Sequence, residues 1–258
     1  MKYSIDYAGI SFRGSVRLEN QDQYCIVDQV SQKNATDTNV FSGKIKQRRQ
    51  GLFAIFDGMG GESEGGTASH LAAEHFSHFN HAPGSHPLPD TLYHLMSDIN
   101  DESCQYAVNK HYQAMGTTVA GLYFDHSKVW VFNIGDSRVY QIRNKTITQL
   151  TTDHVLMTPY LANRPLTQYL GIPKEHFVIE PCIHDYALQN KDYYLICSDG
   201  LTNLISDNEI RREIVHAETL ESAVTSLRED VLEQGAPDNA TMILLRVNFR
   251  SQFPFFFF

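Results

Sequence analysis

Continuous apolar runs mark the two strands that the sequence predicts to be most deeply buried. Residues 52–56 (Leu-Phe-Ala-Ile-Phe) and 193–197 (Tyr-Tyr-Leu-Ile-Cys) contain no charged position and end at turn residues. Such a run is typical of a strand covered on both faces. Residues 3–7 alternate instead, which predicts a half-exposed strand. Further strands are predicted at 24–27 and 241–247. Four more, at 118–124, 128–134, 139–142 and 147–150, are joined by short turns, which predicts antiparallel hairpins.

Apolar positions at helical spacing predict helices between these groups of strands. One pattern runs through residues 66–79, and a second follows the prolines of 83–89 and extends to about 115. A Ser-x-x-Glu capping box at Ser206 predicts the start of a third helix, and a fourth pattern covers about 220–233. The polar stretch 31–50 is interpreted as a hairpin loop, and the proline-containing stretch 151–190 as a surface excursion.

Length and composition favour one sizeable domain. The 258 residues are 42% hydrophobic, and no linker-like segment divides them, so we expect a single domain at 1–250 followed by a phenylalanine-rich tail at 251–258. The tail has no assigned function. A formal net charge of −9 argues against sequence-independent binding to nucleic acid, which needs a basic face.

The sequence predicts a cytoplasmic chain. The start lacks the apolar segment of a signal peptide, and no stretch approaches the ~20 apolar residues that span a bilayer, so no membrane partner is expected. The four cysteines, at 25, 104, 182 and 197, include no CxxC pair. Reduced thiols without a structural zinc site are the expectation.

Acidic residues recur where predicted strands end or begin. The members of this set are Asp57, Asp136, Asp199 and Asp238, and Asp22 lies in the first turn of the chain. Taken singly, each acid fits an ordinary turn in which Asp bonds its own backbone. The glycines that follow Asp57 also permit a second interpretation, because bare backbone and a carboxylate both offer oxygen ligands to a hard cation.

Convergence of these acids would create a metal site. Two carboxylates ~4 Å apart repel by roughly 4 kcal/mol at an effective dielectric near 20, and divalent cations relieve that repulsion. Oxygen ligands without Cys or His favour Mg²⁺ or Mn²⁺ over zinc. Two such ions can activate a shared water for phosphoester hydrolysis, with Arg17 available to hold phosphate oxygens. Periodicity alone does not establish the convergence, and Arg17, Asn20 and Asp22 are equally compatible with a solvated loop.

Seven short motifs, in order along nearly the whole chain, resemble the PP2C family of metal-dependent protein phosphatases in its bacterial form. The motifs are Arg17-x-x-Asn20-Gln21-Asp22, Asp57-Gly58-Met59-Gly60-Gly61, Gly116-Thr117-Thr118, Gly135-Asp136-Ser137-Arg138, Leu150-Thr151-x-Asp153-His154, Cys197-Ser198-Asp199-Gly200-Leu201 and Asp238-Asn239-x-Thr241. The resemblance implies an α+β fold: a central antiparallel β-sandwich flanked by helices on both faces. Metals would lie at one end of the sandwich, and 151–190 would occupy the place of the family's flap.

The resemblance also implies a metal-ligand set. Asp57 is similar to the carboxylate that bridges two metals, and Gly58 to the carbonyl ligand beside it. Asp199 and Asp238 are similar to further ligands of the first metal. Asp22 matches an acid that holds a metal-bound water.

The resemblance implies two more roles, which do not involve the central pair of ions. Asp136, together with Asp199, matches a pair that binds a weaker third ion. Arg17 matches the phosphate-binding arginine.

The function implied is a protein-serine/threonine phosphatase in which a water bridging two ions, Mn²⁺ or Mg²⁺, attacks the phosphoester. Its partners would be Ser/Thr-phosphorylated proteins and a cognate Ser/Thr kinase. Two departures stand out: Gln21 replaces the usual Glu, and Glu62 replaces a histidine that could protonate the leaving group, so Glu62 is the candidate donor. These departures motivate the alternative, a pseudophosphatase or phosphoprotein-binding module without turnover.

Overall fold

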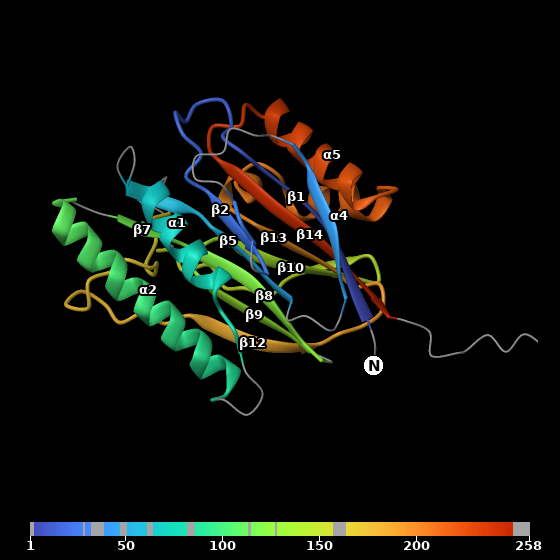
Figure 1. The fold of residues 1–258 in the computed structure, drawn as a ribbon. Coiled ribbons are helices and arrows are strands. Elements are labelled where there is room, and N and C mark those ends of the chain that lie inside the picture. Colours follow the sequence, from blue (N-terminus) through green and yellow to red (C-terminus); the bar gives the residue numbers. More distant parts are fainter. Residues whose placement is uncertain are drawn as a thin grey trace, which may run out of the picture.

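The structure is a computed structural model that describes residues 3–27, 29–31, 39–46, 51–60, 64–81, 86–112, 115–126, 128–156 and 164–249. Two antiparallel six-stranded sheets form its centre (Figure 1). The first sheet has the order β11 (Thr146–Gln149), β10 (Arg138–Arg143), β13 (Tyr193–Cys197), β14 (Ala240–Phe249), β1 (Tyr3–Phe12) and β4 (Phe41–Lys46). The second has the order β12 (Cys182–Ala187), β9 (Lys128–Ile134), β8 (Val119–Asp125), β5 (Gly51–Phe56), β2 (Gln23–Ile26) and β3 (Gln29–Val30).

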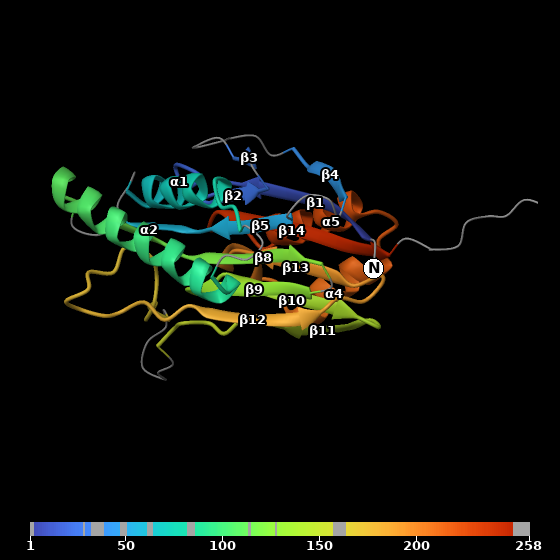
Figure 2. The same ribbon diagram turned by 60° about the horizontal axis from the view of Figure 1, so that its bottom comes forward.

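Helices cover both outer faces of this sandwich, as Figures 1 and 2 show. Helices α1 (Glu64–Ser77) and α2 (Leu88–Lys110) pack on the second sheet. The short α3 (Asp199–Thr202), with α4 (Asp207–His216) and α5 (Leu220–Glu233), packs on the first sheet. A two-stranded ribbon, β6 (Gly58–Gly60) with β7 (Met115–Thr117), continues the end of the second sheet. The predicted α+β sandwich is confirmed.

Strand β5 is buried on both faces, as its apolar run predicts. Its odd-numbered side chains Phe53 and Ile55 belong to the core between the sheets. Its even-numbered side chains Leu52, Ala54 and Phe56 belong to the core beneath α1 and α2. Because successive side chains of a strand point to opposite faces, both faces of β5 must be apolar, and no alternation is left in the sequence.

Strand pairing brings the acidic strand ends to one end of the sandwich. In the first sheet, Cys197 pairs with Arg138 on one side and with Met242 on the other, so the segments next to Asp136, Asp199 and Asp238 are neighbours. In the second sheet, Ile55 pairs with Ala120, which places Asp57 beside the start of β8. The site is therefore built from both sheets.

Three sequence expectations need correction. Strand β1 is almost entirely buried instead of half-exposed, because its side chains enter two cores, one on each face of the first sheet. The stretch 31–50 contains β4, which pairs with β1. The stretch 151–190 contributes β12 to the edge of the second sheet and buries Leu170, so it is more than a surface excursion.

Some expectations fall outside the described residues, among them those for Glu62 and for the tail at 251–258. Among the helices that the structure describes, none combines the length and the apolar character that crossing a bilayer would require.

The predicted capping box of α4 is present and gives a stability test. The Ser206 hydroxyl accepts a hydrogen bond from the Glu209 backbone N–H, and the Glu209 carboxylate accepts one from the Ser206 N–H. We expect Ser206→Ala to lower the free energy of unfolding by about 1 kcal/mol in urea titration, because the Glu209 N–H loses its hydrogen-bond acceptor. Ser97→Ala, inside α2, is the control and should cause no loss, since Ala is the better helix former. Equal stability of wild type and Ser206→Ala would contradict the role of the cap.

Candidate metal and phosphate site

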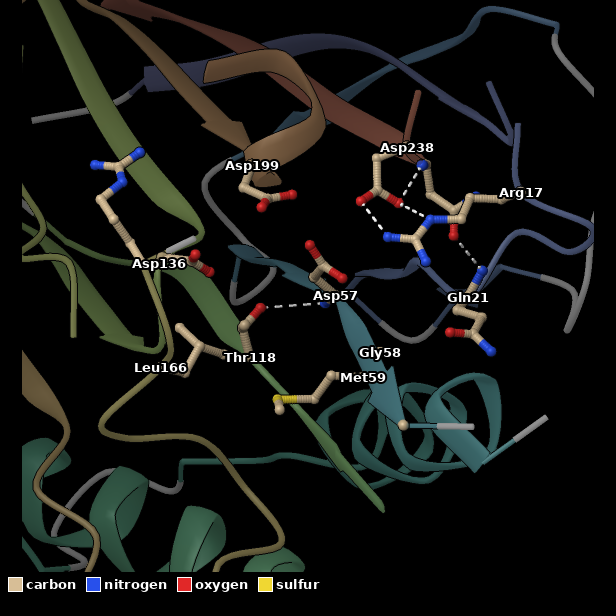
Figure 3. Close-up of a pocket in the computed structure, with 13 residues that line it drawn as sticks. Arg17, Gln21, Asp57, Gly58, Met59, Thr118, Asp136, Leu166, Asp199 and Asp238 are labelled. Atoms are coloured by element: carbon tan, nitrogen blue, oxygen red, sulfur yellow. Dashed lines mark hydrogen bonds and ion pairs between the residues drawn. The ribbon is translucent and has the colours of Figure 1, made fainter. Parts of the chain in front are cut away.

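Four aspartates line a pocket of about 480 Å³ at the end of the sandwich. In Figure 3 the carboxylates of Asp57, Asp136, Asp199 and Asp238 surround one space, and Arg17 reaches in beside Asp238. Each acid comes from a different element: Asp57 follows β5, Asp136 follows β9, Asp199 opens α3 and Asp238 precedes β14. The structure therefore brings together the acids that the sequence singled out.

The backbone of Asp57 is fixed by two threonines of the Gly116-Thr117-Thr118 motif. The Asp57 N–H donates to the Thr118 hydroxyl at 3.2 Å. The Asp57 carbonyl accepts from the Thr118 N–H at 2.9 Å and from the Thr117 hydroxyl at 2.9 Å. Because both backbone groups are held, the carboxylate is aimed into the pocket by the segment that joins β7 to β8.

Glycine is required at Gly58 because other backbone segments approach too closely for a side chain. A Cβ at this position would collide with the Gly65 carbonyl of α1 and lie 2.7 Å from the Gln21 carbonyl oxygen. Gly200 meets the same constraint, since its Cβ would collide with the Asn239 carbonyl. These close approaches bring Asp57 near the first turn of the chain and Asp199 near Asp238.

Asp22 is buried and does not line the pocket, but it lies close enough to Asp199 and Asp238 for their charges to act on it. Its Oδ2 accepts a hydrogen bond from the Ser198 hydroxyl at 2.8 Å, whereas its Oδ1 has no hydrogen-bond partner. Burial, opposed by the hydrogen bond from Ser198, raises the pKa of Asp22 to about 7. A buried carboxylate oxygen without a partner is costly, so Asp22 suits a position behind a bound cation.

The pocket acids raise one another's pKa values. The pKa of Asp57 lies well above its ordinary value. Burial is the largest cause, and the charges of Asp22 and Asp199 raise the pKa further. Burial and then the charge of Asp199 raise the pKa of Asp136 to about 7. The pKa of Asp199 is raised by burial and then by Asp238. Each shift has the direction expected for carboxylates that lack a compensating cation.

Arg17 is bound to Asp238 by two parallel hydrogen bonds. Its Nε donates to Oδ1 at 2.7 Å and its Nη2 donates to Oδ2 at 2.6 Å. This bidentate geometry is the one in which a guanidinium also holds a phosphate. Arg17 thus lies where the sequence placed it, at the edge of the acid cluster, but its fork is already occupied by one of the acids.

The residues fit divalent cations of the Mg²⁺ or Mn²⁺ type. The pocket offers carboxylate and backbone oxygens, and neither Cys nor His lines it. Mutual repulsion of the acids and the unpartnered oxygen of Asp22 both favour added positive charge. No three His, Cys, Asp or Glu side chains of the described part of the chain are grouped closely enough to hold an ion in the arrangement seen. Both carboxylate oxygens of Asp238 are bonded to Arg17 in this arrangement.

The turn that carries Asp136 is held by the Leu150–His154 motif. The Gly135 N–H donates to the His154 Nδ1 at 3.0 Å, and the Gly135 carbonyl accepts from the His154 backbone N–H at 2.9 Å. Nearby, the Arg138 guanidinium binds the Asp153 carboxylate, with 2.6 Å between Nη2 and Oδ2. The motif therefore positions an acid and does not itself line the pocket.

Sequence reasoning missed three supporting residues. Asn239 is the most connected: its amide donates to the carbonyls of Arg13 and Glu19, both at 2.9 Å, and its Oδ1 accepts from the Gln21 N–H at 2.9 Å. Ser198 bonds Asp22, and Arg164 lines the pocket. Asn239 and Ser198 stand beside predicted ligands within quoted motifs, which was a usable signal. Arg164 lies in an irregular stretch without one.

From the sequence, the strand after Asp238 is expected to pair beside both the strand that ends at Asp57 and the strand that ends at Asp199. This expectation is wrong in part. Strand β14, which follows Asp238, pairs with β13, the strand that precedes Asp199, as expected. It does not pair with β5, because β5 and Asp57 belong to the second sheet. The acids therefore converge across the sandwich as well as along one sheet.

The layered sandwich and its pocket of aspartates define the class of this protein as an α+β domain with a carboxylate-lined site at one end of two sheets. The chain belongs to the protein phosphatase 2C family, whose model matches residues 40–235. That match excludes Arg17, Asp22 and Asp238.

Individual relatives match a larger share of the chain than the family model does. The chain is 28% identical over 252 residues to the serine/threonine protein phosphatase PstP of Mycobacterium tuberculosis, covering 93% of this chain and 45% of PstP. It is 26% identical to the serine/threonine phosphatase stp of Listeria innocua, covering 92% and 93%. The crystal structure of the PstP catalytic domain with two manganese ions superposes with a TM-score of 0.76 at 26% identity, covering 96% of this chain and all of that one. The chain spans less than half of PstP but nearly all of its catalytic domain.

Asn239 provides a test of how the site is held. In Asn239→Asp the amide donors are lost, and a carboxylate faces the carbonyl oxygens of Arg13 and Glu19 in a buried position. We expect the free energy of unfolding to fall by about 2 kcal/mol or more, measured by urea titration. Asn144→Asp makes the same chemical change in an exposed turn and should be close to neutral. Equal effects of the two substitutions would show that Asn239 has no special role.

Proposed function

We propose that the chain is a protein-serine/threonine phosphatase that uses two divalent ions, Mn²⁺ or Mg²⁺, to hydrolyse phosphoserine and phosphothreonine. The observation that carries the proposal is the convergence of four aspartates and one arginine in a single pocket at the end of the sandwich. The names of the relatives point to the same activity. Carboxylates would bind the ions, and a guanidinium at their edge would bind the phosphate.

We assign the metal-ligand roles by position. Asp57 and Gly58 line the pocket together with Asp199 and Asp238, and the buried Asp22 is close enough for its charge to act on Asp57. Asp136 and Asp199 would take a weaker third ion, because the charge of Asp199 raises the pKa of Asp136 and both side chains line the pocket. Bound ions of this kind would activate water and stabilise the developing charge on the phosphoryl group.

The chain's own residues orient the substrate. Arg17 can exchange its two hydrogen bonds to Asp238 for two phosphate oxygens, because both partners present a pair of oxygens to the same fork. The repelling acids exclude a phosphate that arrives without cations, which makes hydrolysis depend on metal. Glu62 remains the sequence-based candidate for protonating the leaving group. Phosphorylated proteins and their kinase would be partners in cytoplasmic signalling.

Asp57→Asn tests the metal assignment. The purified chain should hydrolyse a phosphothreonine peptide and p-nitrophenyl phosphate with Mn²⁺ or Mg²⁺ and lose this activity with EDTA. Asp57→Asn should lower kcat at least a thousandfold while its melting temperature stays equal or rises, because removing one acid relieves repulsion in the cluster. Asp90→Asn, which removes an exposed acid at the start of α2, is the matched control and should retain full activity.

Two outcomes of this assay contradict the proposal in different ways. Wild-type rates in Asp57→Asn would refute the site. A folded chain that binds Mn²⁺ by calorimetry without any turnover would favour the pseudophosphatase and direct attention to Gln21 and Glu62.

Arg17→Ala tests the phosphate assignment. Loss of two charge-assisted hydrogen bonds should raise KM for the phosphopeptide about tenfold or more, with a smaller change in kcat. Arg17→Lys keeps the charge but loses the fork, so it should recover only part of the affinity. If kcat falls and KM is unchanged, Arg17 acts on the reacting group during the chemical step and not on binding.

A further inference from the structure

The segment from Arg13 to Gln21 is a loop held rigidly at both ends. The Asn239 side chain bonds backbone groups at residues 13, 19 and 21, and the Ser15 N–H donates to the Ala236 carbonyl at 2.8 Å. The Arg13 guanidinium also donates to the Leu18 carbonyl at 3.1 Å. The tip of this loop, residues 16–18, is therefore presented in a fixed position.

Two large apolar side chains project from this tip. Val16 is 68% exposed and Leu18 is 79% exposed, the highest value among the large hydrophobic residues that the structure describes. We call these two side chains the apolar shelf. Because the backbone is held by hydrogen bonds, their exposure is a property of the loop's folded conformation and is not caused by a loose end.

The apolar shelf is continuous with the active-site pocket. A hollow of about 470 Å³ is lined by Val16, Leu18 and Glu19, together with Arg17, Gln21, Gly60 and Asn239. The last four residues also line the pocket of the aspartates. Arg17 thus separates two adjoining spaces, one acidic and one bordered by the apolar shelf. Figure 3 shows Arg17 and Gln21 together at one side of the aspartate pocket.

We infer that the apolar shelf is a substrate subsite, which binds an apolar side chain one or two residues from the phosphorylated Ser or Thr. The inference rests on the proposed function. A phosphate held by Arg17 fixes the phosphorylated residue at the boundary of the two spaces. Since an extended chain advances ~3.3–3.6 Å per residue, its neighbours reach the shelf. Contact between the two exposed aliphatic side chains and an apolar side chain of the substrate removes apolar surface from water, which is favourable. The subsite therefore selects apolar side chains.

The charge around the hollow further limits which substrate side chains it can bind. Glu19 lines it, and the aspartate pocket lies beyond Arg17. An acidic side chain beside the phosphorylated residue would meet this negative charge, whereas Leu, Ile, Val or Met would not. The preferred substrates are therefore phosphoproteins with an aliphatic residue next to the phosphorylation site, and acid-flanked sites are disfavoured.

The test combines changes in the enzyme with changes in the substrate. A panel of phosphothreonine peptides carries a single Leu or Ser at each position from two residues before to two residues after the phosphothreonine. At the best position, wild type should hydrolyse the Leu peptide with a kcat/KM about tenfold higher than that of the Ser peptide. In Leu18→Ser, and more fully in the double variant with Val16→Ser, this ratio should fall to about one. A substitution that disturbs Arg17 would change kcat/KM for the Leu and Ser peptides alike, so it would leave their ratio unchanged.

Val108→Ser is the matched control, because Val108 is 73% exposed on α2 and lines neither of these two spaces. It should keep both the wild-type rates and the Leu preference. A wild type that does not distinguish the peptides, or a Leu18→Ser variant that keeps the preference, overturns the subsite while leaving the phosphatase assignment intact.

Two further measurements separate the remaining outcomes. If p-nitrophenyl phosphate and all peptides are left intact, the proposed function fails. Fluorescence anisotropy with the same peptides and Mn²⁺ then tests the subsite directly through the Leu-to-Ser ratio of Kd values. Sedimentation of wild type and Leu18→Ser tests a second copy as the occupant: a dimer lost on substitution, without any peptide preference, overturns the subsite and assigns the apolar shelf to self-association.

Discussion

Repulsion among buried carboxylates is the constraint on which the rest of the site depends. Asp22, Asp57, Asp136 and Asp199 all have raised pKa values because they are buried near one another. Such a cluster works against folding unless the backbone that carries it is held strongly elsewhere. The two threonines that clamp Asp57 and the amide of Asn239 provide that support with neutral groups, which leave the negative charge available for cations.

The sandwich supplies the rigidity that this arrangement needs. Each acid stands at the end of a strand whose other side chains are packed in a core, so moving a carboxylate would require moving a buried strand. Because the acids come from both sheets, the packing between the sheets sets the distances between ligands. Strands β5 and β13 are continuous apolar runs because each is covered on both faces. Each leads directly into a segment that carries an acid of the site.

The sequence predicted the features that depend on neighbouring residues and missed those that depend on contacts between residues far apart along the chain. The runs at 52–56 and 193–197, the capping box at Ser206 and the acids at strand ends depend on neighbouring residues, and the structure has them as expected. The burial of β1 depends on two cores whose other members lie far away in the sequence, so its alternation was misleading. The role of Asn239 depends on three contacts more than 200 residues distant, which no periodicity reports. Only the resemblance of ordered motifs to a known family indicated that the acids converge.

The pair formed by Arg17 and Asp238 links phosphate binding to metal binding. Both oxygens of Asp238 accept hydrogen bonds from the guanidinium, so a cation that engages Asp238 competes with Arg17 for the same lone pairs. Under the proposed function, release of Arg17 would free its guanidinium when the pocket gains the positive charge that a phosphate requires. The arginine neutralises part of the acid cluster in the structure, and it would bind phosphate once cations neutralised that cluster instead. Gln21 lines the same edge of the pocket as Arg17 and, being neutral, adds no negative charge beside the guanidinium.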